Sequence, residues 1–308
     1  MAGCRIRGLL CRLFIPQDWE TFPWSAFLGS LLPHAQGLVI DPPYWDPMRR
    51  GPYLQPMDLK VIQKILGLLP ADRPLLVRIT GKDRRKTASH LQHLDEALRP
   101  TAHYGQVVWL DTPLMYHSNR GLPDLLLQLA TLTQRPFALE NDPDRVRPFK
   151  SWSSHVNLRT HVLKQLAHNP RLSALIHHGS LRRSLNYAKA VVKRRDFCLL
   201  DGDEANFLDY PNTTGVVSAS ANVLAPLWAA LLARKSLSGR AEHMTAYMET
   251  MSILQEGLRL LRPHPTAALA EMLHAMGYST TRPALDEEDR KQMHRFLNRL
   301  PDVCIHNY

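Results

Sequence analysis

The sequence has little cysteine and no long apolar run, and each shortage excludes a class of protein. Its four cysteines, Cys4, Cys11, Cys198 and Cys304, lie far apart and form no C-x-x-C pair. This spacing argues against a zinc site or a disulfide framework and fits a reducing cytoplasm. No apolar run approaches the roughly 20 residues that cross a bilayer, and the arginine-interrupted opening is typical of a strand, not of a signal peptide. We therefore expect a cytoplasmic protein with no membrane segment.

Positive charge is in excess, but its pattern does not indicate a nucleic-acid partner. The 308 residues carry a formal net charge of +10, with 15 histidines besides. Most basic residues are scattered, and only the segment 182–195 is dense. Helical spacing places Leu185, Ala188 and Val192 on one face of that segment, as in an amphipathic helix with a solvated basic face. The sequence has no zinc-finger spacing, no P-loop and no aromatic-rich RNA-binding strand, so nucleic acid is not the expected partner.

Short apolar runs alternate with helix-length segments along most of the chain. The segment 171–218 contains three such runs, Leu172–Ile176, Phe197–Leu200 and Gly215–Val217. This alternation is typical of a parallel sheet whose crossovers are helices. Five earlier runs continue the pattern, at Arg7–Ile15, Gln36–Asp41, Pro74–Thr80, Gln106–Asp111 and Arg135–Glu140.

The intervening segments have the apolar periodicity of helices. Those expected helices cover residues 19–32, 57–69, 86–98, 122–132, 158–168 and 182–195, a seventh lies in the helix-length segment between Leu200 and Gly215, and an eighth starts near Leu224. Eight strand–helix units in about 235 residues predict an α/β fold, a (β/α)8 TIM barrel, over residues 1–238. The remainder, 239–308, has three further helical patterns, which predict a C-terminal three-helix extension packed on the barrel.

Four segments resemble one enzyme family. Thr112-Pro113-Leu114-Met115-Tyr116 is similar to a T-P-Y-Y-N stretch, and Leu139-Glu140-Asn141-Asp142-Pro143 is similar to L-Y-N-x-P. Asp201-Gly202-Asp203-Glu204 with Gly215-Val216-Val217-Ser218 resembles S-G-D-D and G-V-I-S. Gly277 to Pro283, with the helix after it, resembles a C-terminal G-x-x-x-x-x-x-P pattern. By these motifs the chain resembles the dihydrodipicolinate synthase and N-acetylneuraminate lyase family.

The resemblance implies a class I aldolase, but the chain departs from the family at the reacting positions. In that family a lysine ending strand six forms a Schiff base with pyruvate or a related oxo acid, and a tyrosine ending strand five relays protons. Here His177 follows Ile176 where the lysine is expected, Glu140 replaces the tyrosine, and Met115 replaces a second tyrosine. An imidazole cannot form the iminium that a primary amine forms. The resemblance implies no cofactor.

Two kinds of site remain open at the expected barrel mouth. In the first, Glu140 and His177 are an acid–base pair joined by a hydrogen bond, which would raise the pKa of the histidine. Tyr44, Met115, Val216 and Ser218 are then the substrate-binding positions for a small oxo acid. In the second, a relocated lysine forms the Schiff base, with Lys82 (or Lys150, after strand five) as the candidate.

Polar residues end most of the expected strands, namely Asp41, Thr80, Asp111, Glu140, His177, Asp201 and Ser218. Such residues can bind a divalent metal, but no H-x-H or H-x-x-x-H spacing supports one, and no metal is expected. Two functions follow: a lyase-type enzyme without the usual lysine, or an inactive paralogue that serves as a binding or structural subunit. A third, less favoured, is nucleic-acid binding through the basic face of residues 182–195, which predicts a steep salt dependence of binding. The Pro-rich segment 42–56 is expected to decide between them by covering the mouth or leaving it open. We expect a homodimer or homotetramer.

Overall fold

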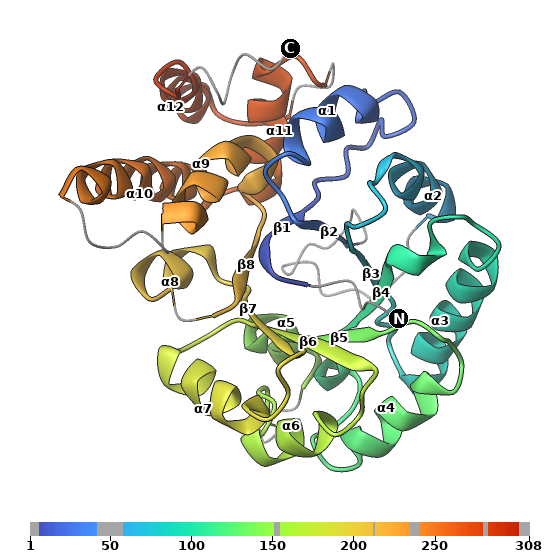
Figure 1. The fold of residues 1–308 in the computed structure, drawn as a ribbon. Helices are drawn as coiled ribbons and strands as arrows, with labels where there is room; N and C mark the ends of the chain where they lie inside the picture. The colour runs from blue at the N-terminus through green and yellow to red at the C-terminus, as the bar shows by residue number, and fades with distance from the viewer. Residues whose placement is uncertain are drawn as a thin grey trace.

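Eight parallel strands close into a barrel. The computed structural model describes residues 6–41, 58–150, 155–211, 213–234, 241–279 and 283–301. Each strand pairs with its neighbours in chain order, and the first pairs with the last, as Figure 1 shows. The predicted (β/α)8 barrel is confirmed. Its strands are β1 (Gly8–Arg12), β2 (Gly37–Ile40), β3 (Leu75–Arg78), β4 (Val107–Asp111), β5 (Phe137–Asn141), β6 (Leu172–His177), β7 (Cys198–Asp201) and β8 (Gly215–Ser218).

Helices surround the strands and follow them in alternation (Figure 1). The main ones around the barrel are α1 (Trp24–Leu31), α2 (Leu59–Leu68), α3 (Arg84–Leu98), α4 (Leu122–Ala130), α6 (Thr160–Leu166), α7 (Leu181–Val191) and α9 (Ala221–Arg234). Short helical turns lie between them: α5 (Pro143–Val146), α8 (Glu204–Asp209), η1 (Tyr104–Gln106), η2 (Pro113–Met115) and η3 (Arg147–Phe149).

The strands are apolar on both faces because both faces are covered. Successive side chains of a strand point to opposite faces, so each strand supplies residues to two cores. The inner core fills the barrel and is made of small and branched side chains: Ile6, Leu10, Val39, Leu76, Val108, Leu110, Ala138, Ala174, Ile176, Cys198, Leu200 and Val217. The outer core lies between strands and helices and contains the large aromatics, among them Trp24, Trp109, Trp228 and Phe137.

The strands that close the barrel approach each other at two glycines. Gly8 and Gly215 are directly paired across the seam between β1 and β8. A Cβ added at Gly215 would lie 2.1 Å from the carbonyl oxygen of Gly8, which is closer than any real Cβ contact. Gly8 itself has φ +76°, a value that L side chains rarely adopt. Closure of the barrel at this seam therefore depends on the missing side chain at Gly215.

Three helices follow the barrel: α10 (Ala241–Leu261), α11 (Pro265–Ala275) and α12 (Glu287–Leu297). They gather on one side of the barrel, near α9 and α1 (Figure 1). Leu254, Met272 and Phe296 from these helices belong to the same outer core as the barrel residues. Tyr278 adds an edge contact with the ring of Phe27, at 5.2 Å between centroids. The predicted extension is present, whereas the predicted boundary at residue 238 lies outside the described residues.

The differences from the predicted elements have local causes. The first helix was expected from Trp19, but it begins at Trp24 because Pro23 occupies its N-cap position. The one-turn helix α5 was missed, although Asp142 caps it by accepting hydrogen bonds from the amides of Asp144 and Arg145. The described cysteines, Cys11 and Cys198, are buried and unpaired. Among the described residues, no helix has the length and apolar character of a membrane span.

We expect Gly215→Ala to destabilise the protein by about 2–3 kcal/mol, because the new methyl group would force β1 and β8 apart. The urea midpoint, followed by circular dichroism, measures this. The matched control is Gly67→Ala, at an exposed position of α2 where an added Cβ meets nothing within 4 Å. That change should stabilise the helix by about 0.5–1 kcal/mol. Equal midpoints for Gly215→Ala and the unaltered protein would contradict the close contact at the seam.

Candidate functional site

A layer of charged side chains lies at the carboxyl end of the barrel, directly above the apolar inner core. Successive side chains of a strand point alternately into and out of the barrel, and this alternation determines which residues belong to the layer. Two residues beyond an inward-pointing apolar residue, the next inward position is polar: Leu10 is followed by Arg12, Val39 by Asp41 and Leu76 by Arg78. The same step leads from Leu110 to Thr112, from Ala138 to Glu140 and from Ile176 to His178.

Arg78 is at the centre of this layer, with a side chain only 1% exposed. Its Nε donates to Oδ1 of Asp41 at 2.5 Å, and its Nη2 donates to Oε2 of Glu140 at 2.6 Å. Its Nη1 donates to the hydroxyl of Thr112. Every nitrogen of the guanidinium therefore has an acceptor, which a buried arginine requires.

Two further arginines bind the same carboxylates. Arg12 donates to Asp41 and, at 2.6 Å, to Oε1 of Glu140. Arg145, from α5, lies 3.3 Å from Asp41 and 3.4 Å from Glu140 through Nη1, and its Nε lies 3.2 Å from Asp142. The charged cluster, as we call it, consists of Arg12, Asp41, Arg78, Glu140, Asp142, Arg145 and His178. Three guanidinium groups and three carboxylates balance within it.

The arginines keep the central carboxylates ionised. Burial alone would raise the pKa of Glu140, but Arg78, Arg12 and Arg145 together hold it well below its usual value. The pKa of Asp41 is lowered in the same way, because the same three arginines outweigh its burial. A general acid or base acts best when its pKa is near the working pH. Glu140 is therefore a fixed negative charge near neutral pH and is not suited to proton transfer.

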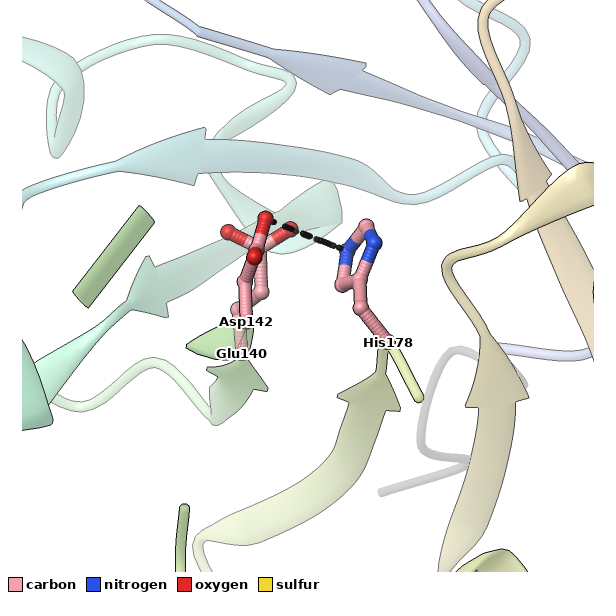
Figure 2. A group of neighbouring side chains, drawn as sticks. All are labelled: Glu140, Asp142 and His178. Carbon is pink, nitrogen blue, oxygen red and sulfur yellow. Dashed lines mark hydrogen bonds and ion pairs between the residues drawn. The ribbon is translucent and has the colours of Figure 1, made fainter. Parts of the chain in front are cut away.

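His178 meets Glu140 and Asp142 at the edge of the cluster (Figure 2). Its Nε2 lies 3.0 Å from Oε1 of Glu140 and 3.9 Å from Oδ2 of Asp142. Potential ligand atoms of the three residues lie within 4.8 Å of one another, a spacing that a metal ion could span. However, both carboxylates already form ion pairs with guanidinium groups. A divalent cation here would face three neighbouring positive charges, so the donor set does not fit a metal.

The expected hydrogen bond between Glu140 and His177 is wrong, because the partner of Glu140 is His178. His177 points away from the barrel interior and is buried against the ring of Tyr187 on α7, 5.0 Å between centroids. Its Nδ1 lies 3.1 Å from the side-chain amide of Asn141. Burial, then the nearby charges of His178 and Arg183, lowers the pKa of His177 to about 4. The expected rise of this pKa is therefore also wrong.

The other expected site residues do not meet at the mouth. Val216 lies in the outer core between the strands and the helices. Ser218 donates a hydrogen bond to Oε1 of Glu204. Met115 is buried in the outer core as part of η2. Lys82 is exposed, and Lys150 is half-buried with its Nζ donating to the carbonyl of His117 at 2.7 Å. Tyr44, together with the segment 42–56, lies outside the described residues.

Two strand-end aspartates belong to local networks and not to the charged cluster. Asp111 accepts hydrogen bonds from Thr80 at 2.8 Å and from Tyr116 at 2.7 Å. Asp201 accepts from the side-chain amide of Asn206 at 2.8 Å, and its burial raises its pKa to about 6. These aspartates anchor the segments that follow β4 and β7. Of the expected strand-end residues, Asp41 and Glu140 alone join the cluster.

The sequence reasoning missed Arg12, Arg78, Arg145 and His178. A signal was present for two of them. Arg12 and Arg78 interrupt the apolar runs LLCRLF and PLLVRIT, and a charged residue inside a parallel strand covered on both faces must find partners at one end of the barrel. No comparable signal marks Arg145, which reaches the mouth from the one-turn helix α5.

Comparison with known proteins gives a match in structure alone. No family model matches the sequence, and no curated protein matches it. A monomeric dihydrodipicolinate synthase variant superposes with a TM-score of 0.74 at 16% identity, covering 97% of this chain and 98% of that one. The chain has the dihydrodipicolinate synthase fold.

Two other solved structures agree. The dihydrodipicolinate synthase of Thermotoga maritima has a TM-score of 0.72 at 15% identity and covers 96% of this chain and 98% of its own. A prophage protein of the dihydrodipicolinic acid synthase family from E. coli K12, solved in complex with pyruvate, has a TM-score of 0.70 at 16% identity with the same coverage. The fold that the resemblance implied is thus confirmed over nearly the whole chain.

We expect Glu140→Gln to lower the free energy of unfolding by about 3–5 kcal/mol at pH 7, because it leaves buried guanidinium groups short of a counter-charge. The folded-state pKa of Glu140 is depressed, so its stabilising contribution is present above the unfolded pKa of about 4.3 and is lost as the pH falls below it. The difference between variant and unaltered protein should therefore shrink at about pH 3.5. Urea unfolding at both pH values measures it.

The control for this prediction is Glu96→Gln, at an exposed position of α3. It should change stability by less than about 0.5 kcal/mol at either pH. If Glu140→Gln is as mild as this control at pH 7, the cluster does not stabilise the fold.

Proposed function

We propose that this protein has the barrel of the class I aldolases without their covalent chemistry, and that it serves as a non-catalytic binding or structural subunit. The observation that carries the proposal is Arg78, which occupies the centre of the barrel mouth in a complete set of contacts to Asp41, Thr112 and Glu140. In a class I aldolase of this fold, as the resemblance implies, the oxo acid and the reacting amine meet at the mouth.

The lysines support the same proposal. Schiff-base chemistry requires a primary amine in a dry pocket, where its pKa falls far enough to leave it unprotonated. Every lysine except Lys235 is among the described residues, and none of these is buried. The inward positions of β6 hold Ala174 and Ile176, followed by His178. A lysine amine is therefore not available to the barrel interior from the described residues.

The second candidate function is a lyase-type pocket for a small oxo acid bound without covalency. It is favoured by the outer edge of the charged cluster, where the side chains of Arg12 and Arg145 are each 14% exposed and that of His178 is 21% exposed. A guanidinium pair of this kind suits a carboxylate ligand, and one protein of this fold was solved with pyruvate. In this case Glu140 and His178, not His177, would be the acid–base groups. The pKa of Glu140, which the arginines hold well below its usual value, argues against this second function because the carboxylate stays ionised.

We also propose that the protein is an oligomer. A homodimer or homotetramer is expected from the resemblance, although one protein of this fold is a monomeric variant. A non-catalytic subunit is most useful as part of an assembly, so light scattering of the full chain is an informative companion measurement.

We expect no covalent adduct when the protein is incubated with pyruvate and borohydride and its intact mass is measured. The physical reason is that none of the lysines in the described part of the chain is buried at the mouth. The Thermotoga maritima synthase is the positive control for trapping. A stable adduct on this chain would contradict the proposal, and peptide mapping would then test Lys82 against Lys150. Heat released on titration with pyruvate, with no adduct, would favour the second candidate.

A further inference from the structure

The excess positive charge of the chain comes entirely from one segment. Residues 145–195 contain 12 of the 38 lysines and arginines and none of the 28 aspartates and glutamates. The rest of the chain has slightly more acidic than basic residues, although the whole carries +10. In the fold the described part of this segment includes α6, β6 and α7, and the two helices lie side by side on the outside of the barrel (Figure 1).

Some of these basic residues are used internally. Arg145 belongs to the charged cluster, and Arg171 donates to backbone carbonyls, including that of Ala130 at 3.1 Å. Arg194 pairs with Asp196 at 2.7 Å. Six others are exposed, and no ion pair involves them among the residues that the structure describes. We call them the basic face: Arg159, Lys164, Arg182, Lys189, Lys193 and Arg195.

Helix α7 sets the spacing of the basic face. Its inner side, with Ser184, Tyr187 and Val191, is buried against the barrel, so its outer side is exposed to solvent. Arg182 and Lys189 are two turns apart on that side, an axial rise of about 10 Å. One strand of a nucleic acid duplex carries about three phosphates over that length. Like charges held this close repel one another unless an anion covers them.

The chemistry of the surrounding side chains favours a nucleic-acid backbone over other anions. His161, Gln165 and Asn186 are exposed among the basic residues and can donate hydrogen bonds to phosphate oxygens. The one aromatic residue of α6 and α7, Tyr187, is fully buried, so these helices have no platform for stacking on single-stranded bases. The exposed apolar residues Leu185 and Val192 are too few, and lack the aromatic anchors, for insertion into a lipid surface.

We propose that the basic face binds double-stranded nucleic acid through its phosphates, without sequence preference. The contact area is limited by acidic residues on the neighbouring helices, with Asp124 on α4 and Asp203 and Asp209 at the two ends of α8. This surface is separate from the charged cluster and does not depend on the function proposed for the barrel mouth. In the sequence the dense segment 182–195 suggested a solvated helix face; the fold adds α6, with its own exposed basic residue Lys164, beside it.

The test is fluorescence anisotropy of a random-sequence 20-base-pair DNA duplex with the full chain, from 50 to 300 mM salt. We expect the logarithm of the affinity to fall linearly with the logarithm of the salt concentration. Arg182→Gln combined with Lys189→Gln and Lys193→Gln should weaken binding by about tenfold or more at 100 mM salt. It should also reduce the salt slope by about 3, close to one for each lost phosphate contact.

The matched control removes the same net charge from another surface, by combining Lys60→Gln, Arg85→Gln and Lys86→Gln on exposed positions of α2 and α3. It should change the affinity by less than about threefold. Equal losses in the two triple variants would show an effect of net charge alone and overturn the proposal. So would an absence of binding at 50 mM salt, or binding to phosphatidylserine-containing vesicles or to polyglutamate as tight as binding to the duplex.

Discussion

The ion pairs of Arg78 with Asp41 and Glu140 fix the arrangement and the charge state of the side chains at the carboxyl end of this barrel. Moving such charges out of water is costly, and their mutual attraction offsets that cost only when the pairing is complete. In the charged cluster the pairing is complete. Three guanidinium groups are matched by three carboxylates, and Thr112 accepts the remaining hydrogen bond of Arg78. The residues lie in or directly after β1, β2, β3, β4 and β5 and in α5, so the pairing connects parts of the chain that are distant in sequence.

This arrangement is compatible with the proposed loss of the chemistry that the resemblance implied. A fold supports many functions, and the function depends on the side chains at the site. Here the side chains at the mouth satisfy one another. The resemblance aligns Glu140 with the family tyrosine, and the surrounding arginines hold the pKa of Glu140 well below its usual value, far from the range useful for proton transfer. The charges of the cluster are paired with one another within the protein.

The sequence was sufficient for the barrel and insufficient for the direction of its side chains. All eight strands were predicted within a few residues of their observed bounds, because each is a short apolar run between helical patterns. It was harder to predict whether a given residue points into the barrel or toward the helices. A parallel strand buried on both sides has no alternation of polar and apolar residues to indicate its inner face. A one-residue shift exchanges the two faces. His177 was expected at the mouth because the resemblance aligned it with the family lysine after Ile176, whereas the structure places His178 there. The charged cluster also needed α5, whose single turn is too short for a helical periodicity.

Long-range electrostatics divides the molecule into two independent regions. The charged cluster contains equal numbers of guanidinium and carboxylate groups, so at distances beyond a Debye length, about 10 Å at 0.1 M salt, it contributes little to the field outside the barrel. Arg145 illustrates this, because it belongs to the basic segment in sequence but is neutralised at the mouth. The field over α6 and α7 therefore comes from the exposed residues of those helices and the turns beside them. The charges at the mouth therefore contribute little to the anion binding proposed for the basic face.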